Sequence, residues 1–184
     1  MRQRGFSLGL VAVASLVAAC SERQITAPSS TLDLAASAER QAREPNCEDV
    51  HGAFVFTSFA FTGPTTAAGA GTVRGDLSGT FTAAYFDIAP QPDGVIHMHA
   101  HHTITRRSGT IMTSDDIRLL PDPDPAWVRP SSRLEVTGGT GAYKGATGLL
   151  LTDGRVNLNV VPPAGSIQIN GQLCVPQAEE AGDR

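Results

Sequence analysis

The chain has 184 residues, of which 14 are basic and 18 acidic, and its formal net charge is −4. Lysine and arginine form no basic stripe, so the sequence argues against nucleic-acid binding. The length is sufficient for one domain of ordinary size with flanking segments.

The first twenty residues have the organisation of a bacterial secretion signal. Arg2 and Arg4 precede an uncharged apolar run, residues 6–19, which is too short to span a bilayer. Small residues lead directly into Cys20, and this ending resembles the lipobox of bacterial lipoprotein precursors. We therefore expect residues 1–19 to be removed and Cys20 to carry the lipid. The mature chain would then have 12 basic and 18 acidic residues, a net charge of −6.

Lipidation of Cys20 would hold the protein at the membrane of the cell envelope. Ser21 follows the cysteine in place of aspartate, which resembles the pattern for delivery to the outer membrane where one exists. Residues 20–45 are polar without a sustained apolar period, so we expect a flexible tether, with a short helix near 32–43 as the alternative. The domain is expected over 46–176, followed by a disordered tail at 177–184.

Cys47 and Cys174 are the cysteines left for the domain, one near each end. An exported protein lies in a compartment that permits disulfides, and with Cys20 lipidated only one intramolecular pairing remains. Closing a loop of roughly 128 residues would contribute at most about 5 kcal/mol. The pairing also predicts that the first and last strands of the domain are neighbours.

The domain consists of apolar segments separated by turn residues, a pattern typical of β-strands. In chain order, the predicted strands are 53–61, 72–88, 95–105, 110–120, 133–137, 148–151, 155–161 and 166–175. Asp153-Gly154, between two apolar runs, is the strongest local hairpin signal. About eight antiparallel strands with neighbouring ends predict an all-β fold, a single closed barrel, with a two-sheet sandwich as the alternative.

Residues 134–148, LEVTGGTGAYKGATG, resemble the glycine segment of the allene oxide cyclase and dirigent-like barrel superfamily. The preceding run, HMHAHHTITRRSGTIMTSDD, is similar to the strand–turn–strand of bacterial members, and the resemblance covers about 52–174. It implies an eight-stranded antiparallel barrel with an interior cavity, often trimeric. The glycines expected to permit tight turns and close backbone approach are Gly138, Gly139, Gly141, Gly145 and Gly148.

His97, His99 and His101 share one face of the strand 95–105, because side chains alternate with period two. Two neighbouring imidazoles can chelate a metal, but three on a regular strand span about 13 Å and cannot all reach one tetrahedral ion. His51, Asp115 or Asp116 would have to supply further ligands. We expect either a polar, water-facing row or a weak metal site, and no cofactor.

The opposite face of the same strand carries Met98 and His102 among aliphatic residues. Asp115 and Asp116 lie on the next strand and point to opposite faces, so one of them can enter a barrel cavity. Burial there would raise its pKa and suit it to acid catalysis. Tyr85 or Tyr143 could donate a hydrogen bond to a ligand.

The sequence identifies no catalytic set. The domain has no Gly-x-Ser-x-Gly elbow, and both of its cysteines are assigned to the disulfide. The expected function is binding of a small apolar ligand inside the barrel, or a structural role at the envelope. A cyclase or isomerase that uses the cavity and weak metal binding through residues 97–102 are the alternatives.

Overall fold

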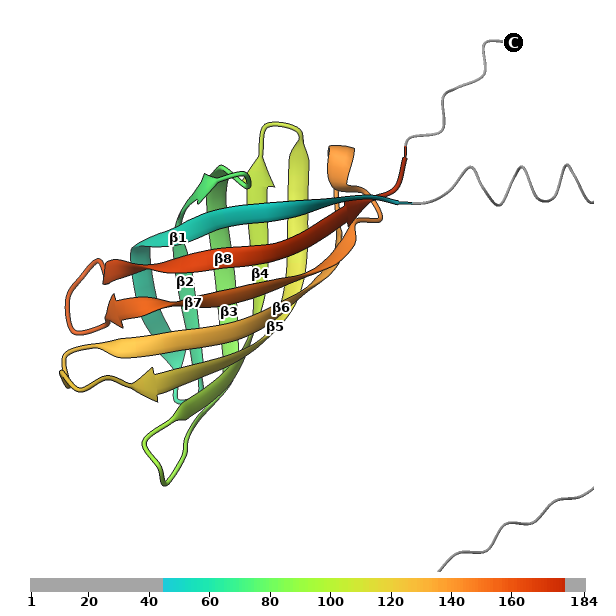
Figure 1. Ribbon diagram of the computed structural model, residues 1–184. Helices are drawn as coiled ribbons and strands as arrows, with labels where there is room; N and C mark the ends of the chain where they lie inside the picture. The colour runs from blue at the N-terminus through green and yellow to red at the C-terminus, as the bar shows by residue number, and fades with distance from the viewer. Residues whose placement is uncertain (1–44, 178–184) are drawn as a thin grey trace, which may run out of the picture.

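The computed structural model describes residues 45–177, and these form a closed barrel (Figure 1). Each strand pairs antiparallel with the next one along the chain, and β8 pairs with β1. The strands are β1 (Asn46–Gly63), β2 (Thr66–Gly75), β3 (Gly79–Pro90), β4 (Ile96–Arg106), β5 (Gly109–Pro121), β6 (Val128–Gly139), β7 (Thr147–Asn157) and β8 (Ala164–Val175). The predicted barrel is confirmed. The sandwich alternative is wrong, because the pairing of β8 with β1 closes the sheet on itself.

The predicted number of eight strands is correct, although two of the predictions are wrong. One predicted strand covers parts of two strands, and two predicted strands belong to a single one. Residues 72–88 form parts of two strands, because Gly75, with φ of 85°, opens a turn that Ser78 closes by donating its N–H to the Gly75 carbonyl. Asp153-Gly154 is not a hairpin turn, since both residues lie inside β7 and pair with β8. A Cβ on Gly154 would meet the backbone of Ser166, so this glycine marks a close approach of two strands.

Strand β2 is built mainly from small residues, which is why the apolar pattern did not reveal its first half. Its inward positions include Gly69 and Gly71, which lie beneath large rings from the neighbouring strands. A Cβ on Gly71 would stand 2.6 Å from the Phe81 ring, and one on Gly69 would stand 3.2 Å from the Tyr85 ring. The absence of a side chain at Gly69 and Gly71 therefore makes room for the aromatic core of the barrel.

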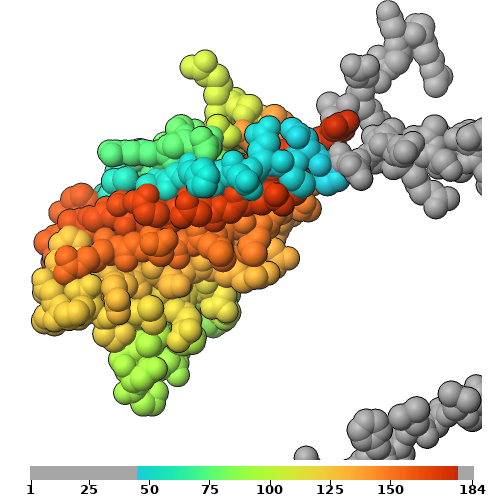
Figure 2. Space-filling model, viewed as in Figure 1, coloured from blue at the N-terminus to red at the C-terminus, as the bar shows by residue number. Residues whose placement is uncertain are grey.

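The two ends of the domain meet at the seam between β1 and β8. Cys47 stands opposite Cys174 in the strand pairing, and the structure brings the two cysteines to disulfide distance, as predicted. In Figure 2 the first strand, in cyan, and the last strand, in red, run side by side along the surface. The predicted neighbourhood of the first and last strands is confirmed.

The glycine segment connects β6 to β7 through a single 3-10 turn, Gly141–Tyr143. Gly141 has φ of 58° and Gly145 has φ of 73°, conformations that side chains with a Cβ rarely adopt. A Cβ on Gly141 would also meet the Ser108 carbonyl oxygen in the β4–β5 turn. Gly141 and Gly145 thus provide the tight turn, and Gly139, Gly141 and Gly148 the close backbone approach, that the sequence predicts. At Gly138 a Cβ would meet no atom within 4 Å, so close approach is not the reason for this glycine.

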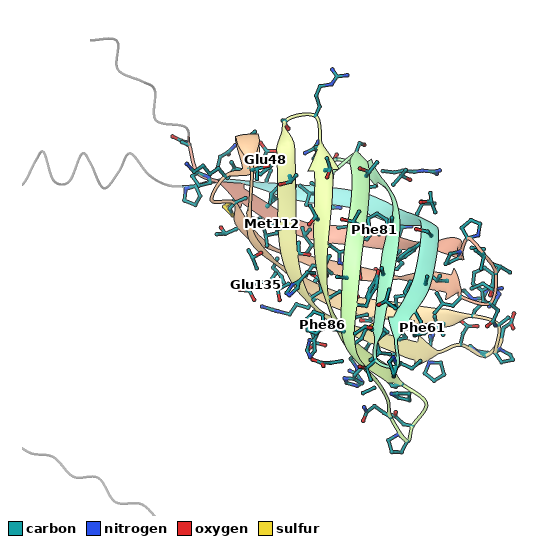
Figure 3. All side chains as sticks on the ribbon, turned by 180° about the vertical axis from the view of Figure 1, so that it is seen from behind. Glu48, Phe61, Phe81, Phe86, Met112 and Glu135 are labelled. Carbon is teal, nitrogen blue, oxygen red and sulfur yellow. A yellow bond between two sulfur atoms is a disulfide. The ribbon has the colours of Figure 1, made fainter. Side chains whose placement is uncertain are left out.

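Alternate residues of each strand point into the barrel and form one apolar core, which includes Phe54, Phe81, Ile104, Leu134 and Ile169. Figure 3 shows Glu48 near the end that carries the chain termini and Phe61 toward the other end. Within residues 45–177, no helix has the length and apolar character needed to cross a membrane. The predicted signal peptide, Cys20, nearly all of the tether and most of the tail lie outside the described residues.

Candidate functional site

The barrel contains a pocket at the end formed by the β5–β6 and β7–β8 loops. Its cavity volume is about 50 Å³, and all the empty space of the hollow, including open solvent at its mouth, is about 580 Å³. The cavity volume is several times what one water molecule requires. The lining is mostly aromatic and aliphatic, with the aromatic side contributed by Phe54, Phe56, Phe59 and Tyr85. Such an apolar wall with a few polar groups is the usual composition of a small-molecule site.

A buried histidine and a buried aspartate form the polar centre of the site. His102 on β4 hydrogen-bonds through Nδ1 to Oδ2 of Asp115 on β5. Their side chains are 6% and 0% exposed, so the pair is shielded from water. His102 lines the pocket and Asp115 does not. The carboxylate therefore orients the imidazole from behind, while the opposite edge of the ring faces the cavity.

Tyr85 on β3 lines the pocket beside His102. Its Oη lies 3.5 Å from Nε2 of His102, which is the limit of a hydrogen bond. Burial, and after it the negative charge of Asp115, raises the pKa of the Tyr85 phenol well above its usual value. Tyr85 consequently keeps its proton at physiological pH and presents a hydroxyl donor beside the imidazole.

Aromatic rings hold the imidazole in place. The Phe54 ring stacks on His102 with ring centroids 5.2 Å apart and an interplanar angle of 24°. Phe81 packs against the same imidazole at 5.7 Å, and Tyr85 meets it edge-on at the same distance. Packing on several sides fixes the ring orientation, so Nε2 points in one direction.

Several buried polar atoms at this level of the barrel are unpaired within the described residues: Asp115 Oδ1, Thr113 Oγ1 and Thr152 Oγ1. Of these residues, Thr152 lines the pocket and the other two do not. An unpaired buried hydroxyl costs free energy unless something supplies a partner. The Thr152 hydroxyl is thus a third polar group that a ligand in the pocket can satisfy.

The structure separates the four predicted cavity residues. Met98 and His102 line the pocket, and Asp115 is buried against His102. Asp116 is exposed on the outer face of β5, so its candidacy for the cavity is wrong. Strand alternation explains this result, because Asp115 faces inward opposite the buried Ala100 and its neighbour must face outward.

His97, His99 and His101 are exposed on the outer face of β4, on the side away from the cavity. Phe86 on β3 packs beside His99 and His101, with ring centroids 5.7 and 5.1 Å away. His51 lies on β1 and hydrogen-bonds to Asn170, so it supplies no ligand to the row on β4. Among the described residues, no group of three or more histidine, cysteine or acidic side chains is arranged to hold a metal ion.

Tyr143, the other predicted donor, lies at the opposite end of the barrel from the pocket. Its hydroxyl accepts hydrogen bonds from Arg106 and Ser108 of the β4–β5 turn. A second, larger hollow at this end has a cavity volume of about 480 Å³, against about 50 Å³ for the first, and is lined by Glu48, Asp49 and Asp76 together with Arg106 and Tyr143. Glu48, Asp49 and Asp76 are exposed, so this hollow lacks the mainly apolar wall of the first.

His102, Asp115 and Tyr85 form one hydrogen-bonded group, although the sequence pointed to each of them only separately. The two-residue turn Arg107-Ser108 between β4 and β5 is the local feature that could have predicted the His102–Asp115 pair. A tight turn at this point pairs His102 with Thr113 and places Asp115 two residues further along the same inward face. Tyr85 could not be found in the same way, because the β3–β4 pairing contains a bulge between Phe86 and Ala89.

No protein-family model matches this chain, and neither a curated protein nor a solved structure matches it. The resemblance to the allene oxide cyclase and dirigent-like superfamily therefore stays a prediction based on residues 134–148 and the strands before them.

Proposed function

We propose that the barrel binds a small, mainly apolar molecule in the pocket and that a lipid on Cys20 holds it at the cell envelope. The observation that carries the proposal is the pocket itself, with four aromatic side chains and aliphatic residues around His102. An apolar molecule that leaves water for such a wall gains about 25 cal/mol per Å² of buried apolar surface. The envelope location rests on the signal sequence and the cysteine that ends it.

A pair of neighbouring serines provides a matched test of the binding site. Ser132 lines the pocket and Ser131 is exposed on the outer face of the same strand. Toluene should raise the Tm of the wild-type protein by an amount that grows with the logarithm of one plus its concentration over its Kd. Ser132→Trp should abolish this shift by filling the pocket, and Ser131→Trp should retain it. Equal shifts in both variants, or none in the wild type, would refute binding in this pocket.

A cyclase or isomerase that transfers protons is the second candidate function. The observation that favours it is the imidazole held by Asp115 with Tyr85 beside its free edge. Nε2 of His102 would take a proton from the carbon next to a carbonyl and return it to another carbon of the same molecule. The Tyr85 hydroxyl would donate a hydrogen bond to the oxygen on which negative charge develops.

Conversion of 3-cyclohexen-1-one to its conjugated isomer, followed by ultraviolet absorbance, tests this second candidate. It is supported if the wild-type protein accelerates the reaction and Tyr85→Phe lowers the rate by about 10²-fold, the scale of one oxyanion donor. A rate equal to that of buffer in both proteins would leave binding as the function.

A further inference from the structure

The polar groups of the pocket indicate the chemical class of its ligand. This inference rests on the proposed binding function. His102 Nδ1 faces the carboxylate of Asp115, which accepts hydrogen bonds and does not donate them when ionised. The proton on the imidazole therefore lies on Nδ1, and Nε2 of the neutral ring presents a lone pair to the cavity. A ligand that uses this nitrogen must supply a hydrogen-bond donor.

Tyr85 imposes the opposite requirement at the same place. Its hydroxyl retains its proton and lines the pocket, so it offers a donor. The 3.5 Å between Oη and Nε2 makes any direct bond between them weak, and each group has capacity for a better partner. A ligand atom placed against both groups must therefore accept from Tyr85 and donate to His102.

A hydroxyl oxygen meets both requirements with a single atom. It donates its own proton to Nε2 and accepts the Tyr85 proton in a lone pair. A methyl group can make neither hydrogen bond. The unpaired Thr152 hydroxyl in the same lining adds another group with both capacities.

We infer that the pocket binds an alcohol or a phenol, with the hydroxyl hydrogen-bonded to both His102 Nε2 and Tyr85 Oη and the apolar body against the phenylalanines. Asp115 acts in this arrangement as a positioning residue, because it orients the imidazole without lining the pocket. The apolar body of the ligand extends toward the open mouth of the hollow, since the cavity volume is only about 50 Å³.

Phenol and toluene are the probes that test this inference, because they differ by a hydroxyl in place of a methyl group of similar size. Phenol loses more hydration than toluene on entering an apolar pocket, so the informative quantity is the change in their Kd ratio between proteins. Two hydrogen bonds should shift that ratio in favour of phenol by about ten-fold in the wild type, relative to a pocket that lacks both partners.

Two variants remove the partners and a third serves as control. Tyr85→Phe deletes one hydroxyl and keeps the ring. His102→Phe/Asp115→Leu replaces the whole buried pair, so that no unpaired charge is left inside the barrel. Both should lose the preference for phenol while toluene binding persists. Thr113→Val removes a buried hydroxyl that does not line the pocket and should leave the ratio unchanged.

The outcomes separate this inference from the function on which it rests. If toluene binds and the phenol preference is the same in every protein, the hydroxyl assignment is overturned and binding in the pocket stands. If neither probe binds to the wild type, both fail. If the double variant does not fold, Tyr85→Phe still tests the hydroxyl assignment. The nitrogen-15 resonance of His102 Nε2 in the wild type provides a second test, because phenol must shift this resonance and toluene must not.

Discussion

Cys47 and Cys174 stand opposite each other at the β1–β8 seam, with their Cα atoms 3.9 Å apart. The two residues are separated by 127 positions in the sequence. Their disulfide therefore joins the first and last strands at the end of the barrel where the chain enters and leaves.

Loss of this disulfide should destabilise the barrel without opening the pocket, which lies at the other end. We expect Cys47→Ser/Cys174→Ser to lower the free energy of unfolding by about 2–5 kcal/mol, because the unfolded chain regains the freedom of a long loop. Urea denaturation measures this loss. Mass spectrometry of unreduced tryptic digests should find peptides 44–74 and 156–184 linked, and two free thiols would contradict the pairing.

Tyr85 should make the protein less stable in alkaline solution. Its pKa is raised in the folded state above the ordinary value of 10.0, so above that pH the unfolded chain releases a proton that the folded chain retains. The free energy of unfolding should then fall as pH rises past 10, and Tyr85→Phe should show a smaller fall. Urea denaturation of the wild type and Tyr85→Phe at about pH 8 and about pH 10.5, on either side of the ordinary tyrosine pKa, measures the two falls in the free energy of unfolding. Equal falls in both proteins would refute the raised pKa.

Gly71 should tolerate no side chain, because a Cβ would meet the Phe81 ring and the backbone of β1. Gly71→Ala is expected to destabilise the fold by about 1–3 kcal/mol through overpacking. The neighbouring Thr72 is exposed, and Thr72→Val should change stability by no more than about 0.5 kcal/mol. Thermal denaturation of the two variants tests the difference. An unchanged stability of Gly71→Ala would show that the Phe81 ring and the backbone of β1 leave room for a methyl group.

The outward row His97, His99 and His101 should bind zinc only weakly. A regular strand can direct two neighbouring imidazoles at one ion but not a closed set of four ligands. Calorimetric titration should show weak binding that disappears in His97→Ala/His99→Ala and persists in His51→Ala, whose histidine lies on β1. Tight stoichiometric zinc in the purified protein would overturn this expectation.

Cys20 should carry the lipid that attaches the protein to the envelope. Palmitate should label the wild-type protein, and Cys20→Ser should lose the label and move to the soluble fraction, because the thiol is the site of acylation. Equal labelling of both proteins would remove the basis for the envelope location.

Local sequence patterns were sufficient for the fold class and for dividing the side chains of β4 between two faces, but not for deciding which face is inward. Side-chain alternation has a period of two whatever the strand pairs with, so the sequence alone separates Met98 and His102 from the outward row of histidines. The pairing of Cys47 with Cys174 followed from chemistry, since one partner remained for each thiol. Glycine was ambiguous, because Gly75 starts a turn and Gly154 lies inside a strand, and only the neighbouring backbone distinguishes them.

The site itself was decided by tertiary structure. His102, Asp115 and Tyr85 come from three strands, and their contact depends on strand register and on the bulge in the β3–β4 pairing. The aromatic core fits because β2 carries glycine where its neighbours carry aromatic rings, a match of sizes between segments that no single segment reveals. Composition and alternation are local properties of the chain, whereas a cavity and a hydrogen-bonded pair arise only when distant strands close the barrel.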